Sequence, residues 1–209
     1  EQLYVGGDNP ANYHLFSSRQ PSPIHDYSKL IDIIDDDKMN GIGEKQSALS
    51  KNWFKKHTDD GMLGQLRKHT LNFFKNRIGE TPASNKMWTV FKNSCWDESR
   101  DQNRQLVWRN RIKGNGYSRG FIPCNAKGTN QYRNKTALAY LVNRYQYVPV
   151  KNLFARLGIE SNEDHFGLSE MLKWIWRSPI RDGKPIRLYV PSSRMRNLLI
   201  RWIEDTGKG

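Results

Sequence analysis

Residues 120–130 read Gly-Phe-Ile-Pro-Cys-Asn-Ala-Lys-Gly-Thr-Asn, a short apolar run followed by a turn of small and polar residues. The apolar part predicts a strand. Pro123 cannot donate a ladder hydrogen bond, so it marks the end of that strand or the edge of a sheet. Loops at the carboxyl ends of strands are where open α/β sheets bind ligands. We therefore expect the turn at 125–130 to hold the phosphates of a nucleotide or of a nucleic-acid backbone.

The residues on either side of this stretch alternate between strand and helix patterns. Helices are predicted where apolar residues recur at helical spacing, and strands where short runs are aromatic or β-branched. The predicted strands are 87–91 and 186–190, and the predicted helices are 97–113, 135–147, 150–157, a helix from Leu168 to Pro179, and a last helix capped by Ser192 or Ser193. Such alternation predicts an α/β fold with a mostly parallel sheet flanked by helices.

The region before this alternation has a different character. Residues 44–78 show two amphipathic helical patterns separated by Asp59-Asp60-Gly61, and basic residues crowd both. This predicts a basic helical insertion or subdomain near residues 44–80. We expect an acidic N-terminal segment plus this subdomain over 1–80, and the α/β domain over 81–209.

Charge is distributed unevenly along the 209 residues, whose net charge is +13. Residues 1–50 carry −4, and the remainder carries +17. A basic excess interleaved with aromatic residues favours a nucleic-acid partner, DNA or RNA, over an anionic protein partner or a merely solvated basic face.

Several classes of protein are disfavoured by what the sequence lacks. No run approaches the roughly 20 apolar residues of a membrane span, and no secretory signal pattern opens the chain. We therefore expect an intracellular, cytoplasmic protein with no membrane partner, and the initial Glu1 favours a processed chain or a fragment. Cys95 and Cys124 lack the spacing of a zinc site and predict reduced thiols, with no metal.

Two stretches together resemble a known family. Residues 120–130, followed by Thr-Ala-Leu-Ala-Tyr at 136–140, look like a motif V region, and Ser-Glu-Met-Leu-Lys-Trp-Ile-Trp-Arg-Ser-Pro-Ile-Arg at 169–181 looks like a variant motif VI. Both resemble the second RecA-like domain of superfamily 2 helicase-like proteins from phages and mobile elements. Residues 87–91 would then be the motif IV strand.

The resemblance implies half of an ATP site. Arg177 and Arg181 would supply the catalytic arginines, and the nucleotide or backbone contacts would come from Lys127, Gly128, Thr129 and Asn130. Motif VI usually reads Gln-x-x-Gly-Arg-x-x-Arg, whereas here Lys173 and Trp176 stand at the Gln and Gly positions and Arg181 follows Arg177 by four residues instead of three.

Walker A and an Asp-Glu box do not occur in the sequence. ATP and Mg²⁺ would therefore be bound mainly by a first RecA-like domain of the same protein, and this chain alone would be inactive.

Two other functions compete with the motor lobe. One is a non-catalytic DNA- or RNA-binding protein of a phage or mobile element, with Trp53, Trp88 or Tyr117 stacking on bases. Under both hypotheses the phosphate-contacting residues are predicted to be Lys51, Lys55, Lys56, Arg67, Lys68, Arg104, Arg109 and Arg111. The other is a nuclease or inhibitor with a metal cluster at Asp97, Glu98 and Asp101, or at Glu163 and Asp164.

Overall fold

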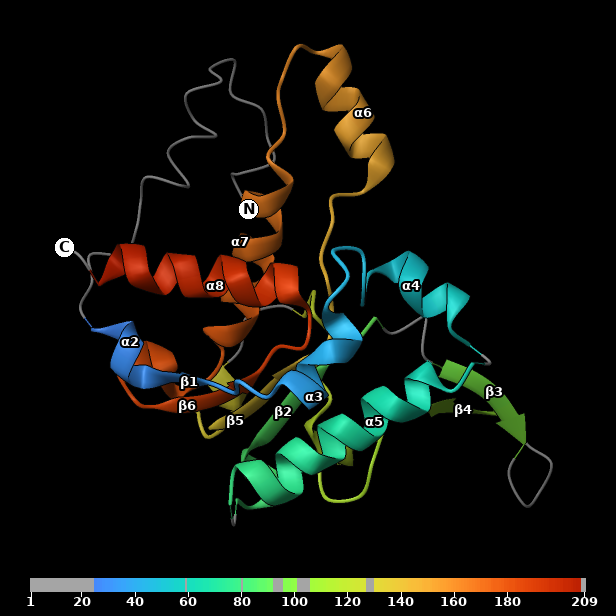
Figure 1. Cartoon of the computed structure of the whole chain (residues 1–209), viewed down its shortest axis with the longest axis vertical. Coiled ribbons are helices and arrows are strands. Elements are labelled where there is room, and N and C mark those ends of the chain that lie inside the picture. The colour runs from blue at the N-terminus through green and yellow to red at the C-terminus, as the bar shows by residue number, and fades with distance from the viewer. Residues whose placement is uncertain are drawn as a thin grey trace.

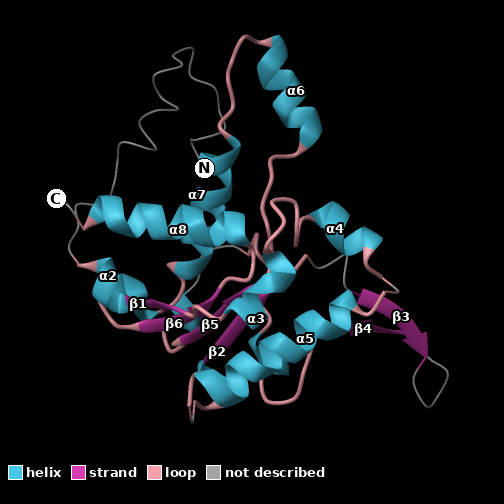
Figure 2. Cartoon of the chain, in the orientation of Figure 1, coloured by secondary structure: helices cyan, strands magenta, loops and turns pink. Residues whose placement is uncertain are grey.

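The computed structural model of the chain describes residues 25–58, 60–79, 81–91, 96–100, 106–126 and 130–207. A four-stranded parallel sheet has the order β1 (Ile31–Ile33), β6 (Ile186–Tyr189), β5 (Ala137–Tyr140) and β2 (Lys86–Thr89). Helices cover both faces of this sheet (Figures 1 and 2). The predicted α/β fold with a parallel sheet between helices is confirmed.

The central strand is β5, which pairs with β2 on one side and β6 on the other. Residues 137–142 read Ala-Leu-Ala-Tyr-Leu-Val, and every one of them is buried. Leu138 and Tyr140 enter the core on one face of the sheet, while Ala137 and Ala139 enter the core on the other. A strand covered on both faces needs such a continuous apolar run.

The helix predicted over 135–147 is therefore wrong. Leu138, Leu141, Val142 and Tyr145 match helical spacing by coincidence, because a strand buried on both faces does not show the alternation that identifies a half-exposed strand. After β5 the chain stays without regular structure until α6 (Val148–Arg156).

Each face of the sheet has its own helical layer. The first core is covered by α2 (Tyr27–Leu30), α7 (Glu163–Ile175) and α8 (Ser193–Thr206). The second is covered by α3 (Asp37–Asn40), α4 (Lys51–Lys56) and α5 (Met62–Asn72), the last continuing into a wider helical turn at Phe73–Arg77. The apolar pattern within 44–78 thus predicts its two principal helices correctly.

The helix predicted over 97–113 is also wrong. These residues form an antiparallel hairpin of β3 (Trp96–Arg100) and β4 (Leu106–Asn110), with Trp96 opposite Asn110, and Figure 1 shows it extending past the end of α5. In the sequence, two short runs with aromatic or β-branched residues flank the polar segment Asp-Gln-Asn-Arg-Gln at 101–105, and that arrangement is typical of a hairpin.

The strand predicted from the apolar part of residues 120–130, Phe121 to Cys124, is reduced to a single bridge. Phe121 lies beside Trp88 in parallel, and the amide of Ile122 donates to the Trp88 carbonyl at 2.9 Å. Pro123 follows and cannot continue the ladder. The expectation of an edge position holds, but the pairing is shorter than predicted.

Other expectations are confirmed by the element bounds. Strand β2 overlaps the predicted range 87–91 but begins at Lys86, and β6 lies within 186–190. Helix α7 includes Leu168 to Ile175, and the Ser192 hydroxyl caps α8 by accepting from the amide of Met195 at 3.4 Å. Since β1 pairs with β6, the sheet draws on both sides of the boundary predicted near residue 80. Among the described residues, no helix combines the length and the apolar character needed to cross a membrane.

The carboxyl edge of the sheet is tied to residues 46–49. The Asn143 side-chain amide donates to the carbonyls of Gln46 at 2.7 Å and Ala48 at 3.0 Å, and its backbone amide donates to the Leu49 carbonyl at 2.8 Å. Leu49 has a φ of 60°, which a non-glycine residue adopts at a cost of about 1–2 kcal/mol. The hydrogen bonds from Asn143 and complete burial of the Leu49 side chain hold this conformation.

We expect Gly43→Ala to lower the free energy of unfolding by about 3 kcal/mol, since a Cβ at Gly43 would overlap the backbone carbonyl of Pro191. Gly41→Ala is the matched control, because a Cβ there meets nothing within 4 Å and its φ of −54° is helical. Denaturant unfolding of the two variants checks this. Equal midpoints would contradict the close approach of residue 43 to the turn after β6.

Candidate functional site

Helix α7 positions the candidate site. The side chain of Asn162 caps it by accepting from the amides of Asp164 and His165, both at 3.0 Å. One face of α7 buries Met171, Trp174 and Ile175 against the sheet. Its Trp174 indole donates to the Ile122 carbonyl at 3.2 Å, which fixes the segment 122–126 beside the helix.

Arg177 follows immediately after the end of α7 and is 8% exposed. Its Nη2 donates to the carbonyl of Ala126. Its Nε and Nη1 are buried and have no hydrogen-bond partner among the described residues. Burial lowers the pKa of this guanidinium, as expected for a charged group removed from water without a matching countercharge.

Two hydroxyl groups on the sheet face that α7 covers are likewise buried without a hydrogen-bond partner among the described residues. Thr89 and Tyr140 are register partners in β2 and β5, so their side chains leave the sheet on the same side. Both are fully buried, and neither hydroxyl oxygen has a partner within the described part of the chain. Burial raises the pKa of Tyr140 well above its ordinary value, so it stays a neutral donor.

A carboxylate lies nearby but is engaged elsewhere. Glu170 accepts from Arg144 Nη2 at 2.9 Å and pairs with Lys173 at 3.3 Å. Arg144 Nη1 also approaches the Cys124 sulfur at 3.7 Å, and burial raises the pKa of that thiol despite the nearby guanidinium. The positive charge of Arg177 therefore has no carboxylate in contact with it within the described residues, which suits the site to an anion.

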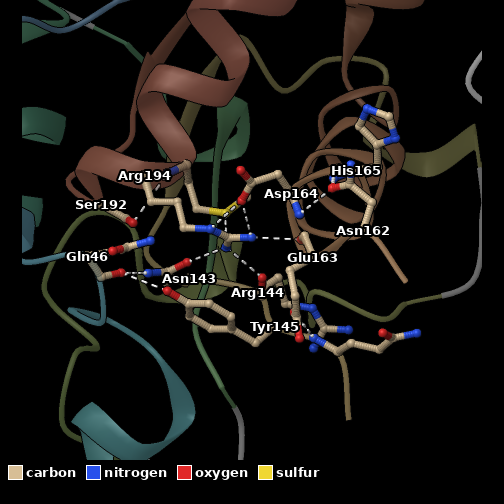
Figure 3. Close-up of polar contacts among 12 residues, drawn as sticks. Gln46, Asn143, Arg144, Tyr145, Asn162, Glu163, Asp164, His165, Ser192 and Arg194 are labelled. Atoms are coloured by element: carbon tan, nitrogen blue, oxygen red, sulfur yellow. Dashed lines mark hydrogen bonds and ion pairs between the residues drawn. The ribbon is translucent and has the colours of Figure 1, made fainter. Parts of the chain in front are cut away.

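A second buried arginine, Arg194, has the opposite character (Figure 3). Its Nε donates to Asp164 at 2.8 Å, its Nη1 donates to Asn143 Oδ1 and to the Arg144 carbonyl at 2.9 Å each, and its Nη2 donates to the Glu163 carbonyl at 2.7 Å. The guanidinium also lies over the Tyr145 ring at 4.3 Å. Arg194 is a structural clamp between α8, the start of α7 and the carboxyl edge of β5.

The predicted motif V and motif VI segments do come together. Arg177 contacts Ala126, the residue that immediately precedes the predicted segment Lys127–Asn130. Lys127, Gly128 and Thr129 lie outside the described residues, and Asn130 begins the single turn Asn130–Tyr132. Arg181 is half-buried in the turn Pro179–Asp182, and the neighbouring Asp182 pairs with Arg133 at 3.6 Å.

The predicted nucleic-acid residues fall into two groups. Five cations on α4 and α5 are exposed, and none takes part in the ion pairs found among the described residues; they are Lys51, Lys55, Lys56, Arg67 and Lys68. We call them the α4–α5 basic face. Arg111 instead donates to the Thr58 carbonyl, Arg109 lies in β4, and Arg104 falls outside the described residues.

Some predicted roles are ruled out by burial. Trp88 and Tyr117 are each 1% exposed, and the Trp88 indole donates to the Tyr117 carbonyl at 3.0 Å, so neither stacks on bases. Trp53 is half-buried.

The proposed acidic metal sites find no support. Glu163 and Asp164 engage Lys151 and Arg194. Asp101 lies outside the described residues, as do the side chains of Asp97 and Glu98. Across the described ranges, no group of three or more His, Cys, Asp or Glu is placed to hold a metal.

Sequence reasoning missed Arg144, Glu170 and the true role of Arg194. Nothing in the pattern of the last helix distinguishes Arg194 from the other arginines of that helix, whereas in the structure residues 143–144 and 163–164 converge on its guanidinium. Gly167 is the one available signal, since a Cβ there would lie 3.2 Å from Arg194 and 3.0 Å from the Arg144 carbonyl. A small residue inside an amphipathic helix indicates such a close approach.

Comparison with known proteins gives a consistent family. A family model described as the YonV C-terminal Rossmann-like domain matches residues 25–203. The chain is 41% identical over 167 residues to the SPbeta prophage-derived uncharacterized protein YonV of Bacillus subtilis (strain 168). The match covers 80% of this chain and 37% of that relative, so the chain spans little more than a third of the relative's length. No solved structure matches the chain.

We expect Arg194→Met to lower the free energy of unfolding by about 3 kcal/mol, because Asn143 Oδ1 and the carbonyls of Arg144 and Glu163 would lose their donor in a buried setting. Arg201→Met on the exposed face of α8 is the matched control and should change it by less than about 0.5 kcal/mol. Chemical denaturation of both variants measures this. Similar midpoints would show that Arg194 is not a clamp.

Proposed function

The chain belongs to the YonV C-terminal Rossmann-like domain family, and on that premise we propose that it is the second lobe of a nucleotide-driven nucleic-acid motor. This is the role that the resemblance to the second RecA-like domain of superfamily 2 helicases implies. The prophage origin of the relative supports the phage or mobile-element source that accompanies this resemblance.

The observation that carries the proposal is the state of Arg177. A buried guanidinium with two nitrogens lacking partners among the described residues is costly, so its burial favours a negatively charged ligand. Phosphate oxygens fit best, because a guanidinium can bind them through two parallel hydrogen bonds. The contact with Ala126 supports a shared site in which residues 127–130 approach the same ligand.

In this role the lobe completes an ATP site without being the whole of it. Arg177, with Arg181 as the second candidate, would neutralise charge that develops on the transferred phosphoryl group. Mg²⁺ and most of the nucleotide would be held by a first RecA-like domain, since the chain has no Walker A sequence. The chain by itself would not hydrolyse ATP.

The α4–α5 basic face supports nucleic acid as the second ligand. The two helices lie on the opposite side of the sheet from α7 and carry a net charge of +5 over residues 51–77. Exposed cations of this kind contact phosphates without reading sequence. A non-catalytic DNA- or RNA-binding protein is the alternative, and it differs by making no use of Arg177.

We expect tripolyphosphate to stabilise the chain against heating through Arg177, by about 1.4 kcal/mol at ten times the dissociation constant. Arg177→Met should abolish that stabilisation while leaving the stability of the ligand-free domain unchanged or higher, since replacing an incompletely paired buried cation by an apolar side chain is often neutral or stabilising. Differential scanning calorimetry at constant ionic strength measures both.

Lys173→Met is the control for this experiment, because Lys173 lies in the last turn of α7, four residues before Arg177, and is paired with Glu170 at the surface. It should keep the tripolyphosphate effect. An undiminished effect in Arg177→Met would exclude Arg177 as the phosphate ligand and leave the non-catalytic alternative.

We expect the α4–α5 basic face to dominate binding of DNA or RNA. Changing its five cations to Gln should reduce the slope of log affinity against log salt by up to about 4.5 units for duplex DNA, because each cation that no longer neutralises a phosphate lowers the slope by roughly 0.9. Fluorescence anisotropy across a salt series measures this slope. The control removes the same charge from exposed cations elsewhere, namely Lys29, Lys173, Lys184, Arg187 and Arg201. Equal reductions in the two variants would mean that binding has no defined face.

A further inference from the structure

Most of the large hydrophobic side chains that are exposed among the described residues lie in helix α6 or at its two caps, Tyr147 and Leu157. Tyr147, Val148, Leu153 and Leu157 are between 54% and 68% exposed, and no residue of α6 is buried. Figure 1 shows α6 extending away from the sheet beyond the carboxyl end of β5. An exposed apolar surface of this kind marks a site of interaction.

Four apolar residues of α6 and its carboxyl-terminal cap form a stripe. Val150, Leu153, Phe154 and Leu157 follow the spacing i, i+3, i+4 and i+7, which places them along one side of the helix. Helices that enter a groove on another protein present such a stripe. Asn152 and Ala155 occupy the opposite side, together with Val148 in the first turn of the helix.

The base of this projection is fixed. Arg194 holds the carbonyls of both Arg144 and Glu163, so a single buried side chain pins the two ends of the excursion that contains α6 (Figure 3). Tyr145 adds a hydrogen bond from its hydroxyl to the Gln46 carbonyl at 2.8 Å. A helix presented in this way loses less conformational freedom on binding than a mobile loop would.

Charge indicates the chemistry of the partner. Within α6, Lys151 and Arg156 are basic and acidic residues do not occur. Lys151 pairs with Glu163 at 3.1 Å, whereas Arg156 takes part in none of the ion pairs found among the described residues, so a second copy of the stripe would add like charge at Arg156. An apolar groove with an acidic rim is complementary. The matched domain is the C-terminal one of its family, and the match covers only 37% of the relative, so most of the relative's length lies outside it.

We propose that α6 docks into an apolar, acidic-rimmed groove on the part of YonV-type proteins that precedes this domain. The contact fixes the orientation of the domain within the longer protein. It holds whether or not the domain is a motor lobe, because no residue of the phosphate site or of the α4–α5 basic face takes part in it.

Hydrogen exchange tests the proposal by comparing this chain with full-length SPbeta YonV. Protection factors corrected for sequence should be at least about tenfold higher in YonV for the segment that aligns with residues 147–157, as expected when a partner covers a helix. Replacing the YonV residues that align with Leu153 and Leu157 by Asp should remove this protection and leave that of the segment aligned with α8 unchanged. Asp at the two YonV positions that align with Asn152 and Ala155 is the control, and it should leave the protection of the segment aligned with residues 147–157 intact.

Three results would overturn the proposal. Equal protection in the two proteins would show that the preceding part of the chain does not cover α6. The isolated chain could also show the protection and form a dimer by light scattering that Leu153→Asp dissociates. This result would identify a second copy as the occupant. Sedimentation of this chain with phosphatidylglycerol vesicles that is lost in Leu153→Asp would identify a lipid surface.

Discussion

The burial of β5 on both faces is the constraint on which the other features depend. Its residues face two separate cores, so helices must cover the sheet on each side, and a polar group brought near the strand is costly unless it finds a partner. The chain meets this demand at the carboxyl edge with Asn143, whose side chain ties residues 46–48 to the sheet. For the same reason, the hydrogen-bond partners of the two buried arginines, Arg177 and Arg194, indicate what each of them does.

Arg177 and Arg194 are exposed to the same extent, 8%, yet their hydrogen bonding suits them to different roles. Arg194 has each guanidinium nitrogen donating to a side chain or a carbonyl, and it connects segments that are distant in sequence. Arg177 has one such contact, to Ala126, and two nitrogens without partners among the described residues. A satisfied buried cation organises a fold, whereas an unsatisfied one favours an anionic ligand.

The molecule separates its proposed interactions in space. Arg177, the residue of the proposed phosphate site, follows α7, which covers the first core, and the α4–α5 basic face lies on the other side of the sheet. Helix α6 leaves the carboxyl edge between them and is held at its base by Arg194. A motor lobe needs separate surfaces for nucleotide, nucleic acid and the rest of the protein, and these three regions can serve those needs without overlap.

Local patterns in the amino-acid sequence were enough to predict the α/β class, the strands near 87–91 and 186–190, and the helices whose apolar residues face a single core, because those patterns depend on local spacing. The sequence also indicated Arg177, through its resemblance to motif VI. The spacing of apolar residues predicted helices over 135–147 and 97–113 where the structure has strands. In the first segment the strand is buried on both faces and therefore shows no alternation. In the second, the hairpin is defined by pairing between its two strands, which local spacing does not record. Arg144, Glu170 and Arg194 gained their roles only in the tertiary structure. A side chain's hydrogen-bond partners come from segments far away in sequence, so no local pattern distinguishes a buried clamp from an exposed arginine on the same helix.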